Sequence, residues 1–304
     1  MVRSRQSVTI LRSHKGTWMA IVRDIVITGL LLGGILALVS VGLSLQYGVA
    51  RVLNVSHGEF IMVGAFLTIW LLNSTNLNPL VSVLITFPAV MVMGLILHMT
   101  LFRRLMDASP SLEIFEGKSL LASFGLLYVV QNLARIIFGS DVEAYNFLNS
   151  TITSAQIPLN RLVALGFVIV IGLILYFFLA RTRMGKAIRA SAQDPTTAGM
   201  MGVNIHNVLA ICFGLGLGLA AIAGSLLSTL YASQTSMGLP YTVIAIIVVV
   251  LGGLGSISGA MIGGVILGLV SQTVTYFQPS LTFIAYYVIF ILLLLARPKG
   301  IMGR

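Results

Sequence analysis

Four polar or ionisable side chains occur close together in a stretch that is otherwise apolar enough to lie in a membrane. They are Arg51, Asn54, His57 and Glu59, within residues 47–66. Ionisable groups are costly in hydrocarbon and usually face the interior of a helix bundle or a wet cavity. Non-helical backbone at membrane depth, which the glycines of this stretch favour, survives only in the same surroundings. We therefore expect this stretch to line a path for a solute across the membrane.

The candidates for contact with a polar solute are Tyr47, Asn54, His57 and Glu59. If the stretch is helical, Asn54 and His57 share one face, whereas Glu59 lies about 200° from His57 and needs a polar partner of its own. The alternative is that these groups satisfy one another and hold a local break without touching the solute. Neither a catalytic role nor a metal site is expected, because a single histidine and a single glutamate so close in sequence offer too few ligands.

A second unusual stretch is rich in glycine and flanked by apolar residues. Residues 251–268 read LGGLGSISGAMIGGVILG. A phosphate-binding loop would need Lys followed by Ser or Thr after its second glycine, and a dinucleotide-binding turn would need a strand before it. Neither pattern is present, so we expect close helix packing and a break inside the membrane. The glycines expected at the two breaks are Gly58, Gly252, Gly253, Gly255 and Gly259.

The composition indicates an all-α polytopic membrane protein. Of the 304 residues, 58% are hydrophobic and only 9% are charged, and the mean hydropathy is +1.03. Apolar runs long enough to cross a bilayer predict about eight to ten transmembrane segments, including broken or re-entrant segments near 47–79 and 240–278. Interrupted segments in both halves of a chain are typical of transporters that bind their solute at the bilayer midplane. The net charge of +10 does not indicate nucleic-acid binding, because the basic residues cluster at the chain ends and between spans.

The chain is expected to form one transmembrane domain with a short basic segment at each end. The N-terminal extension covers residues 1–24, the transmembrane domain 25–297 and the C-terminal segment 298–304. The apolar run that begins at residue 25 is too long for a signal peptide and lacks a clear cleavage site. We therefore expect it to be retained as the first span.

The positions of Lys and Arg predict which side of the membrane each connection occupies. Both end segments, Arg103, Arg104 and the basic connection at 181–207 are expected in the cytoplasm. Residues 139–160 carry acidic side chains but no Lys or Arg, so we expect them on the outer side. On this assignment, each of the two broken stretches enters and leaves the membrane on the same side.

The basic connection carries more than orientation signals. It reads RMGKAIRASAQ and then TTAGMMG, two helix-compatible segments on either side of Asp194 and Pro195. Asp194 can cap the second helix, with Pro195 at its first position, where a missing N–H costs nothing. Such defined helix ends favour a docking surface for a cytoplasmic partner. The residues expected to form it are Arg183, Gly185, Arg189, Ala190, Asp194 and Gly202.

Four ordered segments resemble the high-affinity branched-chain amino acid ABC transporter permeases, most closely the first of that system's two permease subunits. They are residues 47–66, 183–204, 251–268 and 297–303. The resemblance implies a multi-pass permease subunit of an importer in the bacterial inner membrane. It also implies that Arg183 to Asn204 couple to the ATPase, and it leaves the solute open among branched-chain or other amino acids, amides and urea.

The same resemblance implies the partners of the chain. These are a second homologous permease, two cytoplasmic ATP-binding subunits and a periplasmic solute-binding protein, in addition to the lipid bilayer. The sequence contains no P-loop, so the chain is expected to be neither an ATPase nor another enzyme and to need no cofactor of its own. The alternative is a secondary transporter or channel for a small polar solute, which accounts for the broken segments but not for the capped connection.

Overall fold

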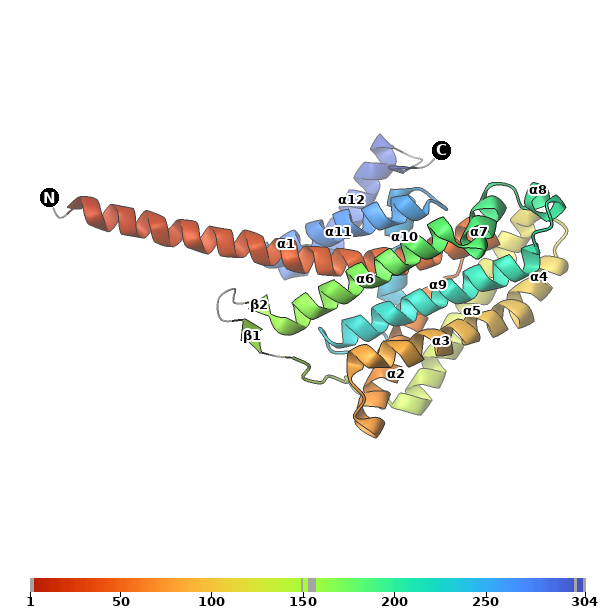
Figure 1. The fold of residues 1–304 in the computed structure, drawn as a ribbon, viewed down its shortest axis with the longest axis horizontal. Helices are drawn as coiled ribbons and strands as arrows, with labels where there is room; N and C mark the ends of the chain where they lie inside the picture. Colours follow the sequence, from red (N-terminus) through yellow and green to blue (C-terminus); the bar gives the residue numbers. More distant parts are fainter. Residues whose placement is uncertain (1–2, 149, 153–156, 298–299, 303–304) are drawn as a thin grey trace.

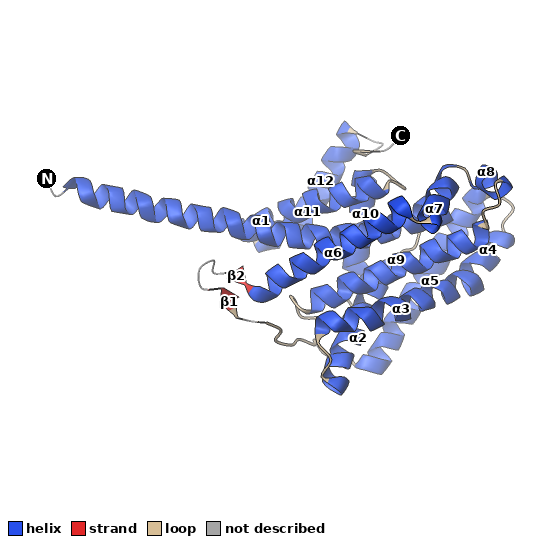
Figure 2. Ribbon diagram, viewed as in Figure 1, coloured by secondary structure: helices blue, strands red, loops and turns tan. Residues whose placement is uncertain are grey.

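The computed structural model describes residues 3–148, 150–152, 157–297 and 300–302. Helices make up nearly all of this part of the chain (Figures 1 and 2). Within it, eight helices are long and apolar enough to cross a membrane, which confirms the predicted all-α polytopic architecture. Six of the eight are α1 (Arg3–Ala50), α2 (His57–Thr75), α5 (Leu112–Phe138), α6 (Leu159–Arg181), α9 (Ile205–Ser228) and α11 (Ile257–Phe277).

The other two spans are composite. One joins α3 (Pro79–Leu97), the π-helical η1 (His98–Phe102) and α4 (Arg103–Asp107), and the other joins the 3₁₀ turn η2 (Pro279–Leu281) and α12 (Thr282–Ala296). The remaining helices are the shorter apolar α10 (Gly238–Gly252) and the connecting helices α7 (Arg183–Gln193) and α8 (Pro195–Met200). Two short strands, β1 (Thr151–Ile152) and β2 (Ile157–Pro158), pair in antiparallel fashion before α6.

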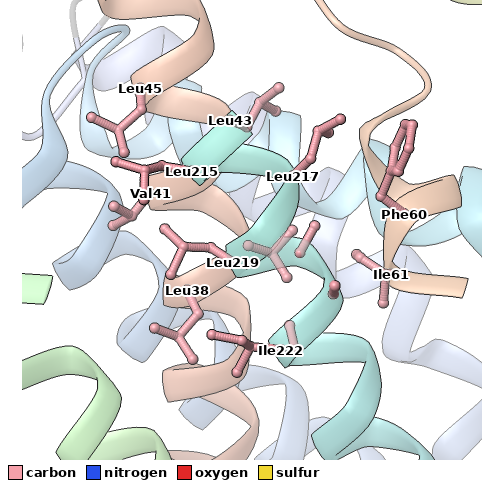
Figure 3. Packing of buried hydrophobic residues seen from close by; sticks show 14 of the residues in the cluster. Leu38, Val41, Leu43, Leu45, Phe60, Ile61, Leu215, Leu217, Leu219 and Ile222 are labelled. Atoms are coloured by element: carbon pink, nitrogen blue, oxygen red, sulfur yellow. The ribbon is translucent and has the colours of Figure 1, made fainter. Parts of the chain in front are cut away.

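Helix α9 lies at the centre of the bundle, where it packs against α1, α2 and α3. Small residues on α9 let neighbouring backbones approach closely, as is common between membrane helices. Gly216 faces Gly42 of α1, and Gly224 lies so close to α2 that an added Cβ would be 1.8 Å from the carbonyl oxygen of Ile61. Leucine, isoleucine and valine side chains from α1, α2 and α9 fill the space around these contacts (Figure 3).

The two ends of the bundle can be identified from contacts between helix ends. Arg161 at the start of α6 pairs with Asp24 of α1, with Nη1 3.3 Å from Oδ1. Helices α7 and α8 follow the opposite end of α6, and the N-terminus points away from them (Figure 1). We call these the Asp24–Arg161 end and the α7–α8 end. The N-terminal end of α1 and the 181–207 connection therefore lie at opposite ends of the bundle, which differs from the expectation that they share a side.

This difference from the expected arrangement arises in the first broken stretch, residues 47–79. Helix α2 has 19 residues and is about 28 Å long at 1.5 Å per residue, enough to cross most of a bilayer. It runs toward the Asp24–Arg161 end, where Phe66 stacks on Phe138 at the end of α5 with ring centroids 5.2 Å apart. The stretch at 47–79 thus carries the chain across the membrane instead of returning to its starting side. Because the chain crosses the membrane once more than expected, α1 begins at the end of the bundle opposite to the 181–207 connection.

The second broken stretch does return to the side it came from, as predicted. Helices α10 and α11 form a hairpin whose turn, at Gly255, contacts Gly48 near the end of α1. The described end of the chain lies beside the same turn, because the N–H groups of Ile301 and Met302 donate to the carbonyl oxygens of Leu251 and Gly252. Residues 300–302 are therefore at the α7–α8 end of the bundle.

Candidate functional site

The break between α1 and α2 spans Arg51 to Ser56 and is built by the chain itself. Arg51 adopts left-handed backbone, with φ at 52°, and its N–H donates to the carbonyl oxygen of Tyr47 at 3.1 Å, which closes the end of α1. Its guanidinium lies 5.9 Å from the centroid of the Tyr47 ring, a distance at which a cation–π contact is favourable.

Asn54 organises this break. Its Nδ2 donates to Oε1 of Gln46 at 3.1 Å, and its Oδ1 accepts from the N–H and the hydroxyl of Ser56 at 3.1 and 2.6 Å. Gln46 in turn donates to the carbonyl oxygen of Phe213 in α9 at 3.2 Å. Both ends of the Asn54 amide are thus engaged inside the protein, where they fix the non-helical backbone.

A serine of α5 supports the same break from the other side. The hydroxyl of Ser123 accepts from the N–H of Val55 at 3.1 Å, and its single proton is shared between the carbonyl oxygens of Leu53 and Leu120, at 3.0 and 2.8 Å. Backbone groups that leave a helix inside a membrane must find partners in the protein, because lipid offers none. Sequence analysis did not identify Gln46 or Ser123, since single polar residues in apolar spans carry no distinguishing pattern.

The first turn of α2 carries the remaining candidates and is fully buried. Nε2 of His57 lies 3.1 Å from the carbonyl oxygen of Val39, to which it donates, while its Nδ1 has no hydrogen-bond partner among the described residues. The N–H of Gly58 donates to the hydroxyl of Thr242 in α10 at 2.8 Å. The starts of α2 and α10 are therefore in direct contact.

Glu59 is the most unusual group at this site. Its side chain is fully buried, and neither carboxyl oxygen has a hydrogen-bond partner among the residues that the structure describes. Gly238, the first residue of α10, packs directly on it, since an added Cβ would lie 2.4 Å from the carboxyl carbon. The guanidinium of Arg135 in α5 interacts electrostatically with this carboxyl group. A buried carboxyl group without a hydrogen bond is costly, so Glu59 requires an explanation beyond packing.

The structure divides the four predicted pathway residues into two pairs. Tyr47 and Asn54 line a cavity of about 70 Å³ between α1, α5 and α10, and its other lining residues are apolar. This volume is far below the roughly 300–1,000 Å³ of typical ligand pockets. His57 and Glu59 do not line this cavity and instead begin α2 beside α10.

The glycine-rich stretch forms the turn between α10 and α11. Gly253 and Gly255 have φ angles of 104° and 78°, which side-chain-bearing residues rarely adopt. Gly252 and Gly259 pack against each other across the turn, and a Cβ on Gly252 would lie 2.3 Å from the carbonyl carbon of Gly259. Among the described residues, no group of three or more His, Cys, Asp or Glu side chains could hold a metal ion.

The connection between α6 and α9 has the two helices that the sequence predicts, and both of them are capped. Thr182 caps α7 by accepting from the N–H of Gly185 at 2.9 Å. Asp194 caps α8 by accepting from the N–H groups of Thr196 and Thr197, at 2.9 and 3.2 Å, and from the Thr197 hydroxyl. Donation from that hydroxyl and from these N–H groups holds the pKa of Asp194 below its usual value.

Most of the predicted docking residues lie on the outer surface of this connection. Arg183, Arg189, Ala190 and Asp194 are exposed, and Gly202 has a left-handed φ of 86°. Gly185 is instead buried against the carbonyl oxygens of Phe178 and Leu179, so it fixes the α6–α7 turn. Sequence analysis missed Met200 and Met201, which are both 82% exposed at the end of α8. Two adjacent methionines in an otherwise polar loop could have indicated a protein-binding surface from the sequence alone.

The sequence matches known transport proteins over most of its length. The family described as "Branched-chain amino acid transport system / permease component" matches residues 25–296. The high-affinity branched-chain amino acid transport system permease protein BraD of Pseudomonas aeruginosa is 30% identical over 298 residues, which cover 91% of this chain and 94% of BraD. LivH of Escherichia coli, with the same description, is 30% identical over 289 residues at the same coverage. A probable branched-chain amino acid transport permease protein LivH of Methanocaldococcus jannaschii is 30% identical over 280 residues, covering 88% of this chain and 89% of that protein. The chain belongs to the branched-chain amino acid transport permease family.

Proposed function

We propose that this chain is a permease subunit of an ABC importer in the bacterial inner membrane and that separate subunits bind and hydrolyse ATP. The single observation that carries the proposal, beyond family membership, is the α7–α8 connection. It is a pair of capped helices inserted between two membrane helices, with Met200 and Met201 exposed beside them. Exposed methionines are common on protein-binding surfaces. A secondary transporter or channel has no ATP-binding subunit and therefore needs no docking surface for one.

The partners follow from the same proposal. Two ATP-binding subunits dock on the α7–α8 end of this chain and of a second homologous permease, and a periplasmic solute-binding protein delivers the solute at the Asp24–Arg161 end. The α7–α8 end is then cytoplasmic together with the C-terminus, and the N-terminal extension is periplasmic. The basic residues of α7 and of α4 at the cytoplasmic end agree with the distribution of Lys and Arg in bacterial membrane proteins, whereas those of the N-terminal extension depart from it.

The packing of α9 offers a route from the ATPase to the solute path. Helix α8 leads through a short turn into α9, and α9 packs against α2 where Gly64 meets Ala221. The start of α2 is tied to α10 by Gly58 and Thr242. Movement of α7 and α8 by the ATPase dimer would therefore shift both broken segments together. The cycle requires that ATP and solute favour different conformations of this unit.

The solute is a branched-chain amino acid or a related small polar molecule, and Glu59 is the group that would bind its ammonium end. The unpartnered carboxyl group supports this assignment, because a charged ligand group would supply the hydrogen bonds it lacks. Asn54 and His57 hold the broken backbone around it. Tyr47 lies beside the break on the surface of the small apolar cavity.

The docking proposal is tested by co-purification with the ATP-binding subunit. Met200→Glu and Met201→Glu are expected to abolish co-purification, because a charge would be buried at an apolar contact. Val142→Glu is the matched control, since Val142 is 63% exposed but lies at the opposite end. Equal recovery of the ATP-binding subunit with all three variants would overturn the docking assignment.

The solute proposal is tested by uptake of leucine into proteoliposomes that contain the assembled transporter. Glu59→Gln keeps the shape of the side chain and removes its charge. We expect KM for leucine to rise about tenfold or more, since a hydrogen bond to a charged group contributes about 1.5–3 kcal/mol. An unchanged KM in a protein that still assembles would restrict Glu59 to a structural role. Leucine uptake driven by an ion gradient without ATP would overturn the importer assignment itself.

A further inference from the structure

An apolar groove of about 660 Å³ runs along the outside of the bundle between α3 and α6. Helix α9 forms its floor, and Figure 1 shows α6, α9 and α3 side by side in that order. The groove exists because α6 packs against α1 whereas α3 packs against α9. Phe87 of α3 lies against Gly218 of α9, which brings α3 close to the floor without closing the gap to α6.

Every lining residue of the groove is apolar, and its walls are exposed. Leu84 on the α3 wall is 75% exposed and Ile174 on the α6 wall is 62% exposed. Water fills an apolar groove poorly, and voids of this size are rarely left empty. The volume lies within the roughly 300–1,000 Å³ of sites that hold small molecules. Both helices are membrane spans, so lipid acyl chains can reach this groove.

Basic residues follow the apolar wall of the groove along the last turn of α6 and the start of α7. Its α6 wall consists of Ile171, Ile174, Leu175 and Phe178. The helical spacing from Ile174 to Phe178 places Arg181 one turn farther on the same face. Arg181 is exposed and makes no hydrogen bond or ion pair with any residue that the structure describes. Met184 of α7 closes this end of the groove.

The charged residues of the last turn of α6 and of α7 are all basic. Arg183 and Lys186 of α7 are also exposed, and there is no acidic residue from position 181 to 193. Asp194, the next acidic residue, already accepts hydrogen bonds from Thr196 and Thr197. Basic pockets between membrane helices bind the headgroups of anionic lipids. Arginine suits this role because its planar guanidinium can donate two hydrogen bonds to one phosphate.

We propose that this groove is a binding site for an anionic phospholipid from the leaflet at the α7–α8 end, with an acyl chain along α9 and the phosphate on Arg181. The lipid would touch α3, α6 and α7 together and so fix the angle between the last turn of α6 and α7. The proposal does not depend on which solute is carried or on how ATP drives the protein.

Native mass spectrometry of the purified full-length chain tests the proposal, with phosphatidylglycerol and phosphatidylcholine of identical acyl chains added in turn. We expect the wild-type protein to retain phosphatidylglycerol more tightly, by about fivefold for each arginine or lysine near the headgroup. Arg181→Gln should lower that preference by about fivefold, while Arg104→Gln, at another exposed arginine of the same end, should leave it unchanged.

A tryptophan pair tests the acyl-chain part of the site. Ile174→Trp fills the groove and should reduce retention of both lipids, whereas Leu173→Trp, at a neighbouring position that is 51% exposed and outside the groove, should not. Equal retention of the two lipids by the wild-type protein would overturn the proposal, as would equal behaviour of the two tryptophan variants. A photo-crosslinker at position 174 that captures a second permease in cells, and not a lipid, would show that the groove is a protein interface and would also overturn it.

Discussion

The N–H of Gly58 donates to the hydroxyl of Thr242 at 2.8 Å, and this hydrogen bond joins the first turn of α2 to the first turns of α10. The same hydroxyl donates to the carbonyl oxygen of Gly238 at 3.3 Å. Two helices that both begin inside the bundle thus share one buried polar contact. A helix start leaves N–H groups without partners in the helix, and lipid offers no acceptor for them. The Thr242 hydroxyl supplies that acceptor for Gly58.

Replacing Thr242 is expected to separate these helix starts. Thr242→Val keeps the volume but leaves the buried N–H of Gly58 unpaired, which should lower the free energy of unfolding by about 1–3 kcal/mol. Thr242→Ser keeps the hydroxyl and is the matched control. Thermal unfolding of the purified chain in one detergent measures the difference. A valine variant as stable as the serine variant would show that the hydrogen bond contributes nothing.

Gly238 is expected to tolerate no side chain. Gly238→Ala would place a methyl group 2.4 Å from the carboxyl carbon of Glu59, so either α10 or Glu59 must move. Overpacking of this kind costs about 1–3 kcal/mol, and we expect a lower melting temperature together with loss of solute uptake.

Gly125→Ala provides the comparison, because nothing lies within 4 Å of the added Cβ in α5. At that position alanine should raise stability by about 0.5–1 kcal/mol, since glycine is unfavourable inside a helix. If the two alanine variants unfold at the same temperature, the close approach of α10 to Glu59 is not a constraint on the fold.

The cap of α8 is expected to depend on pH only in acid. The pKa of Asp194 is below its usual value of 3.8 in the folded chain, so its contribution to stability is fully present above that value and is lost as the pH falls through the folded pKa. Hydrogen–deuterium exchange of residues 196–200, corrected for the intrinsic rate, should therefore be constant from neutral pH to about pH 4 and rise below it. Asp194→Asn should remove this rise, and Asp194→Ala should show fast exchange at every pH. A rise between pH 5 and 7 would mean that another group controls α8.

The arrangement of the two ends is expected to hold in cells. Cysteines introduced as Met19→Cys and Val142→Cys, at exposed positions of the Asp24–Arg161 end, should react with a membrane-impermeant maleimide from the same side. Met200→Cys should react only from the other side. The native Cys212 is buried and should contribute no background. Labelling of Met19→Cys together with Met200→Cys would contradict the crossing made by α2.

Local features of the chain could be read from the sequence because they depend on residues close to one another. The lengths of the apolar runs predicted the membrane spans, since hydrocarbon thickness sets a minimum length for each. Asp194 and Pro195 predicted the start of α8, since a cap acts within three residues of itself. The glycines at 252–259 predicted a break, because positive φ angles and close backbone contact both require a missing Cβ.

The tertiary structure decided what depends on residues far apart in the chain. Counting basic residues predicted that the N-terminal extension and the 181–207 connection share a side, because the first broken stretch was expected to return to its starting side. The pairing of Asp24 with Arg161 and the stacking of Phe66 on Phe138 instead place them at opposite ends of the bundle. The polar residues of the first break appeared as one group in the sequence. In the folded chain Asn54 holds the backbone with Gln46, whereas Glu59 faces Gly238 without a hydrogen-bond partner among the described residues. The helices that pack around a side chain determine its burial and its hydrogen bonds. The local sequence does not predict which helices these are.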